Sequence, residues 1–119
     1  AFADALEVGS RIALIVTFGP SLPALTRELE EMAASRGQDV EITPVLVEGA
    51  LQSLKDGDAA AHDQAVLRAC ADLGPQDAIV LGQFSLARAA DALKPQVDCP
   101  VITTPDSAVR ALRRLISAV

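Results

Sequence analysis

Two short loops carry the polar side chains and glycines that a small-molecule site could use. The first reads T-F-G-P-S over 17–21, and the second reads G-Q-F-S over 82–85. Each loop follows a short apolar run and leads into a helical pattern. A helix N-terminus offers N–H groups and the positive end of its dipole to an anion. The residues that we predict to bind a small carboxylate are Thr17, Gly19, Ser21, Gly82 and Ser85. The simpler alternative is that the hydroxyls are ordinary N-caps and the glycines ordinary turn residues.

Three further polar residues are candidates for chemistry. Gln83 follows the run A-I-V-L-G, and its amide can bind a ligand but cannot act as a base or nucleophile at neutral pH. His62 is the single histidine and follows Asp58, a predicted N-cap. A helix N-terminus disfavours the charged imidazole, so we expect it neutral, in a surface or capping role, with catalysis as the alternative. Asp106 begins the last predicted helix, where it stabilises the N-terminus or, alternatively, contacts substrate.

Composition narrows the classes of function. The chain has 119 residues, half of them hydrophobic, with a net charge of −6, three Phe and no Trp or Tyr. This charge and the lack of stacking side chains exclude a nucleic-acid binder. Neither glycine-rich nucleotide motif is present. No run has the length of a membrane span and no signal peptide is visible, so we predict a cytoplasmic protein. Cys70 and Cys99 are then expected to be reduced, small apolar side chains.

Strand and helix patterns alternate along the chain. Predicted strands lie at 11–17, 39–47, 78–81 and 100–103. Helices are predicted from Ser21 to about Gly37, from Asp58 to about Gly74, from about Ser85 to Pro95, and from Thr104 to the end. Residues 1–6 resemble the tail of another helix, and a short helix is an option within 48–57.

This alternation predicts a three-layer α/β fold with a four-stranded parallel sheet. Pro44 removes one backbone donor, which places the second strand at an edge and gives the order 2-1-3-4. Such a sheet binds ligands beyond the carboxyl ends of its strands, where the order reverses between the first and third strands. The loops 17–21 and 82–85 flank this point. Topology and residue chemistry therefore predict the same location.

Three segments resemble the second lobe of the aspartate/glutamate racemase superfamily. They are V-T-F-G-P-S, A-I-V-L-G-Q-F-S-L-A-R-A-A and P-V-I-T-T-P-D-S-A, in the family's order, and the resemblance runs from about Arg11 to the end. The superfamily includes glutamate, aspartate and hydantoin racemases, arylmalonate decarboxylase and maleate isomerase. The resemblance implies two α/β lobes with the substrate between them, no cofactor or metal, and a catalytic cysteine from each lobe. It implies that Thr17, Gly19 and Ser21 hold the carboxylate.

The same resemblance places Gln83 where the lobe's cysteine would stand, and it makes residues 1–119 a single C-terminal lobe. We therefore expect one lobe of a racemase, isomerase or decarboxylase that is incomplete alone. Its expected partners are a small carboxylate and either a second copy or a missing N-terminal lobe, with no nucleic acid or membrane. The alternatives are a non-catalytic relative that binds a small carboxylate, and a flavodoxin-like or receiver-like interaction domain.

Overall fold

The computed structural model describes residues 2–82 and 84–103. Four strands form one parallel sheet in the order β2-β1-β3-β4, as the sequence predicts. Their bounds are β1 (Arg11–Val16), β2 (Glu41–Leu46), β3 (Ala78–Leu81) and β4 (Val101–Thr103). Pro44 lies in β2, an edge strand whose one pairing among the described strands is with β1. This position tolerates a proline because an edge strand has a neighbour on one side only.

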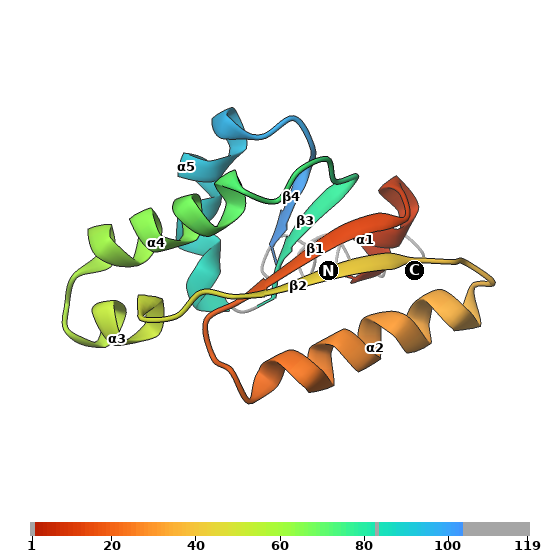
Figure 1. The fold of residues 1–119 in the computed structure, drawn as a ribbon, viewed down its shortest axis with the longest axis horizontal. Helices are drawn as coiled ribbons and strands as arrows, with labels where there is room; N and C mark the ends of the chain where they lie inside the picture. The colour runs from red at the N-terminus through yellow and green to blue at the C-terminus, as the bar shows by residue number, and fades with distance from the viewer. Residues whose placement is uncertain (1, 83, 104–119) are drawn as a thin grey trace, which may run out of the picture.

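Helical segments connect the strands and cover both faces of the sheet (Figure 1). The α-helices are α1 (Phe2–Val8), α2 (Ser21–Ser35), α3 (Ala50–Lys55), α4 (Ala59–Ala71) and α5 (Ala90–Leu93). Two 3₁₀ segments, η1 (Phe84–Ala89) and η2 (Lys94–Gln96), flank α5. The α4 helix begins as predicted, because the Asp58 side chain accepts a hydrogen bond from the Ala61 N–H at 3.0 Å.

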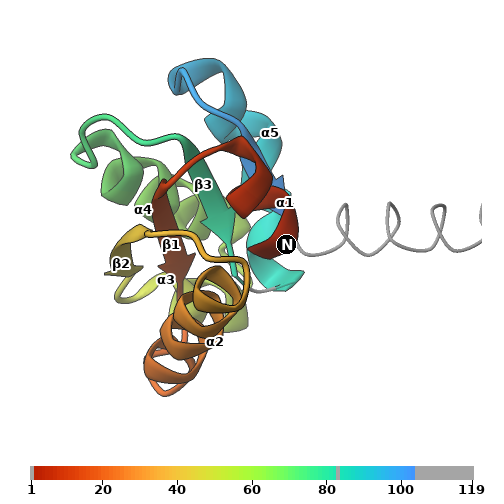
Figure 2. The same ribbon diagram turned by 90° about the vertical axis from the view of Figure 1, so that its right-hand side faces the viewer.

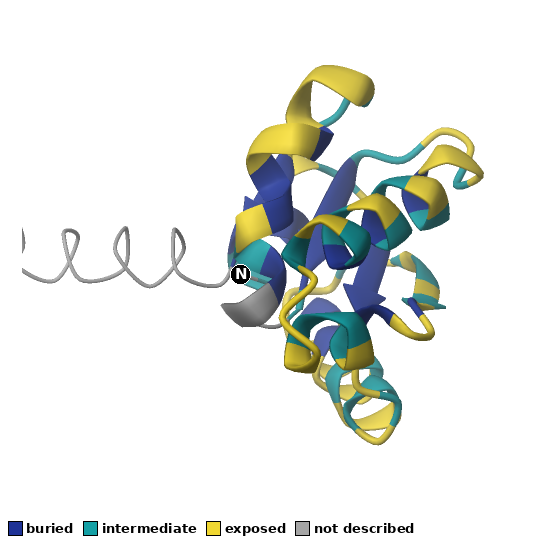
Figure 3. Ribbon diagram, turned by 90° about the vertical axis from the view of Figure 1, so that its left-hand side faces the viewer, coloured by how far each residue is buried: buried dark blue, intermediate teal, exposed yellow. Residues whose placement is uncertain are grey.

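Alternate residues of the central strand pack into two different cores. Ala13 and Ile15 of β1 face α3, α4, η1 and α5, whereas Ile12 and Leu14 face α1 and α2. This alternation follows from the period of two along a strand. Because both faces of the sheet are covered, β1 and β3 are apolar throughout. Figure 2 shows the sheet between its helices. In Figure 3 the strands are coloured as buried, whereas many residues of the surrounding helices are coloured as exposed.

The segment after β3 differs from the α-helix that the sequence predicts. It starts as the 3₁₀ helix η1, becomes α-helical only over α5, and continues through Pro95 in η2. Leu86 and Ala89 are both buried, and residues three apart lie on the same side of a 3₁₀ helix. Burial of this pair against the sheet therefore suits the tighter helix.

The Asp77 side chain ties the start of β3 to the start of β1. Its Oδ2 accepts hydrogen bonds from the backbone N–H groups of Ser10, at 3.0 Å, and Arg11, at 2.9 Å. These bonds hold the pKa of Asp77 below its ordinary value, because they stabilise the ionised carboxylate.

Several predicted features fall outside the described residues. They are Gln83, the side chain of Ser85, Asp106 and the last helix, predicted from Thr104 onward. Within the described ranges, no helix combines the length and the apolar character needed to cross a bilayer.

Candidate functional site

The two glycine-containing loops leave the same edge of the sheet from adjacent strands. Ile15 of β1 pairs with Leu81 of β3, and the Gly82 N–H donates to the Ile15 carbonyl at 2.9 Å. Thr17 and Gly82 therefore begin their loops side by side. The structure confirms the strand order that makes this carboxyl edge a topological switch point. Thr17 is 7% exposed, and Thr103, the last residue of β4, is also buried at this edge.

Gly82 has a structural role that is independent of any ligand. A Cβ atom built there would lie 3.2 Å from both Leu14 Cδ1 and Val16 Cγ1, and 3.4 Å from the Ile15 carbonyl oxygen. These distances are shorter than ordinary van der Waals contacts. A larger residue at this position would crowd the side chains of Leu14 and Val16, so the close packing of β3 on β1 favours glycine here.

Ser21 is not the N-cap of α2, which corrects the sequence-based prediction. Pro20 is the N-cap, and Ser21 is the first helical residue. The Ser21 hydroxyl donates to the Phe18 carbonyl at 2.7 Å. The reason is the turn over 18–21, which brings that carbonyl back to the first turn of the helix. The proton of this hydroxyl is therefore used within the loop.

The N-terminus of α2 offers fewer free donors than a typical helix. The Ser21 N–H donates to Phe18 and the Leu22 N–H to Gly19, both at 3.1 Å. The next residue is Pro23, which has no N–H. An anion at this terminus would meet the helix dipole but not these donors. Side-chain hydroxyls would therefore have to contribute more of the binding than the helix terminus does.

Two exposed apolar side chains lie beside these polar groups. Phe18 is 48% exposed in the loop after β1, and Leu46, which ends β2, is also exposed. Gly19 lies between them: a Cβ atom on Gly19 would be 3.5 Å from Leu46 Cδ2. The carboxyl edge therefore has both a polar part, at Thr17 and Ser21, and an apolar part.

His62 is fully buried, which corrects the expected surface role. Its Nδ1 lies 2.8 Å from Asp63 Oδ1, and Arg88 Nε donates to that same oxygen at 3.0 Å. A second Arg88 nitrogen donates to Asp63 Oδ2 at 3.4 Å. Burial acts to raise the pKa of Asp63, but the hydrogen bonds from Arg88 and His62 outweigh it and leave the pKa below its ordinary value.

These contacts determine the tautomer of His62. Asp63 is ionised and can only accept hydrogen bonds, so the imidazole proton sits on Nδ1. His62 Nε2 is buried without a hydrogen-bond partner among the described residues.

Sequence patterns did not predict that Asp63 and Arg88 form a hydrogen-bonded group with His62. Asp63 is the direct neighbour of His62, which was a usable signal, whereas Arg88 is 25 residues away from Asp63. Only the packing of η1 against α4 brings that guanidinium to the pair.

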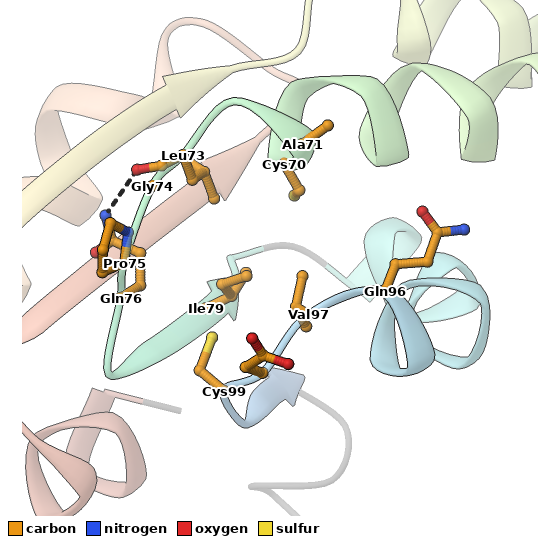
Figure 4. A pocket seen from close by; sticks show the side chains of 11 residues that line it. Cys70, Ala71, Leu73, Gly74, Pro75, Gln76, Ile79, Gln96, Val97 and Cys99 are labelled. Carbon is orange, nitrogen blue, oxygen red and sulfur yellow. Dashed lines mark hydrogen bonds between the residues drawn. The ribbon is translucent and has the colours of Figure 1, made fainter.

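The two cysteines lie at the opposite edge of the sheet. Cys70, near the end of α4, and Cys99, just before β4, both line a cavity of about 420 Å³ at the amino ends of β3 and β4 (Figure 4). Both thiols are free. Burial, with a smaller contribution from Cys99, raises the pKa of Cys70 to about 11, and burial also raises that of Cys99. Neither thiol is therefore placed or activated for chemistry at the carboxyl edge. Residues 2–82 and 84–103 hold no group of three or more side chains suited to a metal ion.

An all-parallel sheet covered on both faces, with hydroxyl-bearing loops where its strand order reverses, defines an open α/β domain whose topological switch point lies at its carboxyl edge. Residues 1–117 match the family model described as Asp/Glu/Hydantoin racemase. The chain belongs to this family. No curated protein matches the sequence.

A solved structure shares the fold. It is the crystal structure of allantoin racemase from Pseudomonas fluorescens, with a TM-score of 0.71 and 19% sequence identity. The alignment covers 99% of this chain and 50% of that one, so the chain spans about half the length of the racemase.

Proposed function

We propose that this chain is the C-terminal lobe of a cofactor-independent enzyme that racemises, isomerises or decarboxylates a small carboxylate or a related compound. The observation that carries the proposal is the family match over nearly the whole chain. The alignment with half of a racemase supports a single lobe. In this proposal the active site forms where the carboxyl edge faces a second lobe, supplied by the same protein or by another copy.

In this proposal Thr17 and Ser21 bind the carboxylate through their hydroxyls, for which the Ser21 proton turns from the Phe18 carbonyl to the ligand. Gly19 lets the carboxylate approach the loop backbone. Phe18 and Leu46 would then contact the apolar part of the ligand, since they are exposed at the same edge. The predicted contact of Ser85 stays a prediction, because its side chain lies outside what the structure describes.

Gln83 limits the reaction in this proposal. An amide can orient a substrate by hydrogen bonding but cannot take or return a proton at the α-carbon. Racemisation by two thiols would need a cysteine at this position in both lobes. Proton transfer from one side only, as in isomerisation or decarboxylation, is more compatible with glutamine. The base would come from the other lobe.

The enzymatic proposal is tested with the full-length protein in deuterium oxide. Proton exchange at the α-carbon, or turnover, is measured by NMR across amino acids, hydantoins, malonates and maleate. Ser21→Ala should lower the rate or the affinity, because it removes a carboxylate contact. Ser35→Ala is a matched control, since Ser35 also donates to a carbonyl three residues earlier, at 2.8 Å, but at the other end of α2. Absence of both exchange and turnover would count against an enzyme.

A non-catalytic relative that binds a small carboxylate is the second candidate. Gln83 favours this candidate, because it stands where the resemblance implies a catalytic thiol, and the lobe would then keep its binding groups without a base. This candidate predicts saturable binding of a carboxylate by calorimetry, weakened by Ser21→Ala, with no turnover. Equal affinity of the Ser21→Ala variant would remove its support.

A further inference from the structure

The cavity at the amino ends of β3 and β4 has the size of a small-molecule site. Its volume of about 420 Å³ falls within the range of roughly 300–1,000 Å³ that ligand pockets occupy. The turn that follows α4 and the segment between η2 and β4 enclose it (Figure 4). Ile79 in its lining is buried, whereas Pro75 and Asp98 are exposed, so the cavity opens to solvent. A ligand can therefore reach it directly from solution.

Apolar side chains from three parts of the chain converge on the cavity. Leu73 follows α4, Ile79 lies in β3, and Val97 precedes β4. The thiols of Cys70 and Cys99 extend this surface, because burial raises the pKa of both and keeps them protonated at neutral pH. A protonated thiol behaves as a small apolar side chain. The lining therefore suits the apolar part of a ligand.

The charge and the helix dipole at the cavity are both negative. Asp98 has the one charged side chain among the described residues that line it. The 13-residue helix α4 ends at Ala71 in the cavity wall, so the negative end of its dipole lies there. Burial is the main cause of the raised pKa of Cys99, and the charges of Asp98 and Asp77 raise it further, so both carboxylates act on this thiol. Each of these contributions favours a cation in the cavity.

The basic side chains nearest to the lining in sequence have other partners. Arg68 Nε donates to the Gln64 carbonyl at 3.4 Å, and Lys94 Nζ lies 4.0 Å from Asp91 Oδ1. Within the described part of the chain, no ion pair involves Asp98. The carboxylate at the cavity can therefore pair with a cation from solution.

We propose that the cavity binds a small organic cation, in which an ammonium group is attached to an apolar alkyl or aryl group. The ammonium pairs with the Asp98 carboxylate at the exposed rim, and the apolar group contacts Leu73, Ile79 and Val97. An anion would be repelled by Asp98 and by the end of α4, and an inorganic cation would leave the apolar lining unused. This inference does not rest on the proposed function, because it involves no residue of the carboxyl edge.

The test is an NMR titration of the isotope-labelled protein with three probes. Phenethylammonium has both the charge and the aryl group, ethylammonium has the charge alone, and hydrocinnamate carries a carboxylate on a similar aryl chain. Phenethylammonium should bind saturably and shift the backbone signals of Ile79, Val97 and Cys99. The other two probes should bind roughly tenfold more weakly or worse, because ethylammonium buries less apolar surface and hydrocinnamate has the same charge as Asp98.

Two charge-matched variants test the position of the ammonium. Asp98→Asn should weaken the binding of phenethylammonium roughly twofold to fivefold, the loss expected for one exposed ion pair. Asp91→Asn removes the same charge from an exposed residue outside the lining and should leave the affinity unchanged. Equal binding of either control probe to the wild-type protein, or an equal effect of the two variants, overturns the inference. So does a failure of phenethylammonium to bind or to shift the cavity signals, and each of these results leaves the proposed function standing.

Discussion

Removal of the Asp63 carboxylate should destabilise the fold much more than removal of its ion-pair partner. Asp63→Ala leaves the buried Nδ1–H of His62 without an acceptor, which costs about 1–3 kcal/mol. It also removes the ion pair with Arg88, whose side chain is 44% exposed, so this part is worth only about 0–1 kcal/mol. The sum is roughly 1–4 kcal/mol. Arg88→Met keeps the aliphatic part of the side chain and loses only the contribution of the ion pair.

The assay is urea denaturation of the ligand-free chain at neutral pH, with the free energy of unfolding taken from the transition. Asp63→Asn is the matched control, because its amide oxygen still accepts from Nδ1. It should therefore lose about 1 kcal/mol or less. In a His62→Phe background there is no buried N–H to leave unpaired. There Asp63→Ala should cost no more than the exposed ion pair.

A result in which Asp63→Ala and Arg88→Met destabilise the chain equally would refute this reasoning. So would an Asp63→Ala penalty that is unchanged in the His62→Phe background, since the penalty would then not come from the imidazole. Either outcome would show that Asp63 serves α4 in some other way than as the acceptor for His62.

Three other predictions follow from the packing, the charges and the thiols. Gly82→Ala should destabilise the chain by about 1–3 kcal/mol because its Cβ would lie 3.2 Å from Leu14, whereas Gly19→Ala, with a Cβ in ordinary contact, should cost little in the same denaturation assay. The lowered pKa of Asp77 gives stability that is present above its ordinary value of 3.8 and is lost as the pH falls through its lower folded value. In the Asp77→Asn variant, the free energy of unfolding should therefore decrease less steeply as the pH falls. The same pH dependence as in the wild-type chain would contradict this prediction. In a Cys99→Ser variant, Cys70, with a pKa of about 11, should react with iodoacetamide at pH 8 roughly a hundredfold more slowly than an ordinary thiol, which mass spectrometry can follow.

Local patterns were sufficient for most of the fold. The apolar runs around β1 and β3, the proline in β2 and the capping Asp58 predict the parallel sheet, its order and the start of α4, and the structure confirms each. Two local predictions were wrong. Ser21 donates to a turn carbonyl instead of capping α2, and η1 winds as a 3₁₀ helix. Both outcomes depend on how the loop or helix meets its neighbours, which residue types along a single segment do not specify.

Part of the candidate site can likewise be predicted from the sequence, and part of it depends on the tertiary structure. The sequence by itself determined that loops with hydroxyls and glycine follow adjacent strands, because strand order and chain order together fix which loops meet at the carboxyl edge. Tertiary structure alone decided the surroundings of His62. The packing of α4 on η1 buries this imidazole and brings a guanidinium 25 residues away to Asp63. It also leaves Nε2 without a hydrogen-bond partner among the described residues. The physical reason is that hydrogen bonds between side chains distant in sequence depend on the packing of whole elements, whereas strands and caps depend on neighbours along the chain.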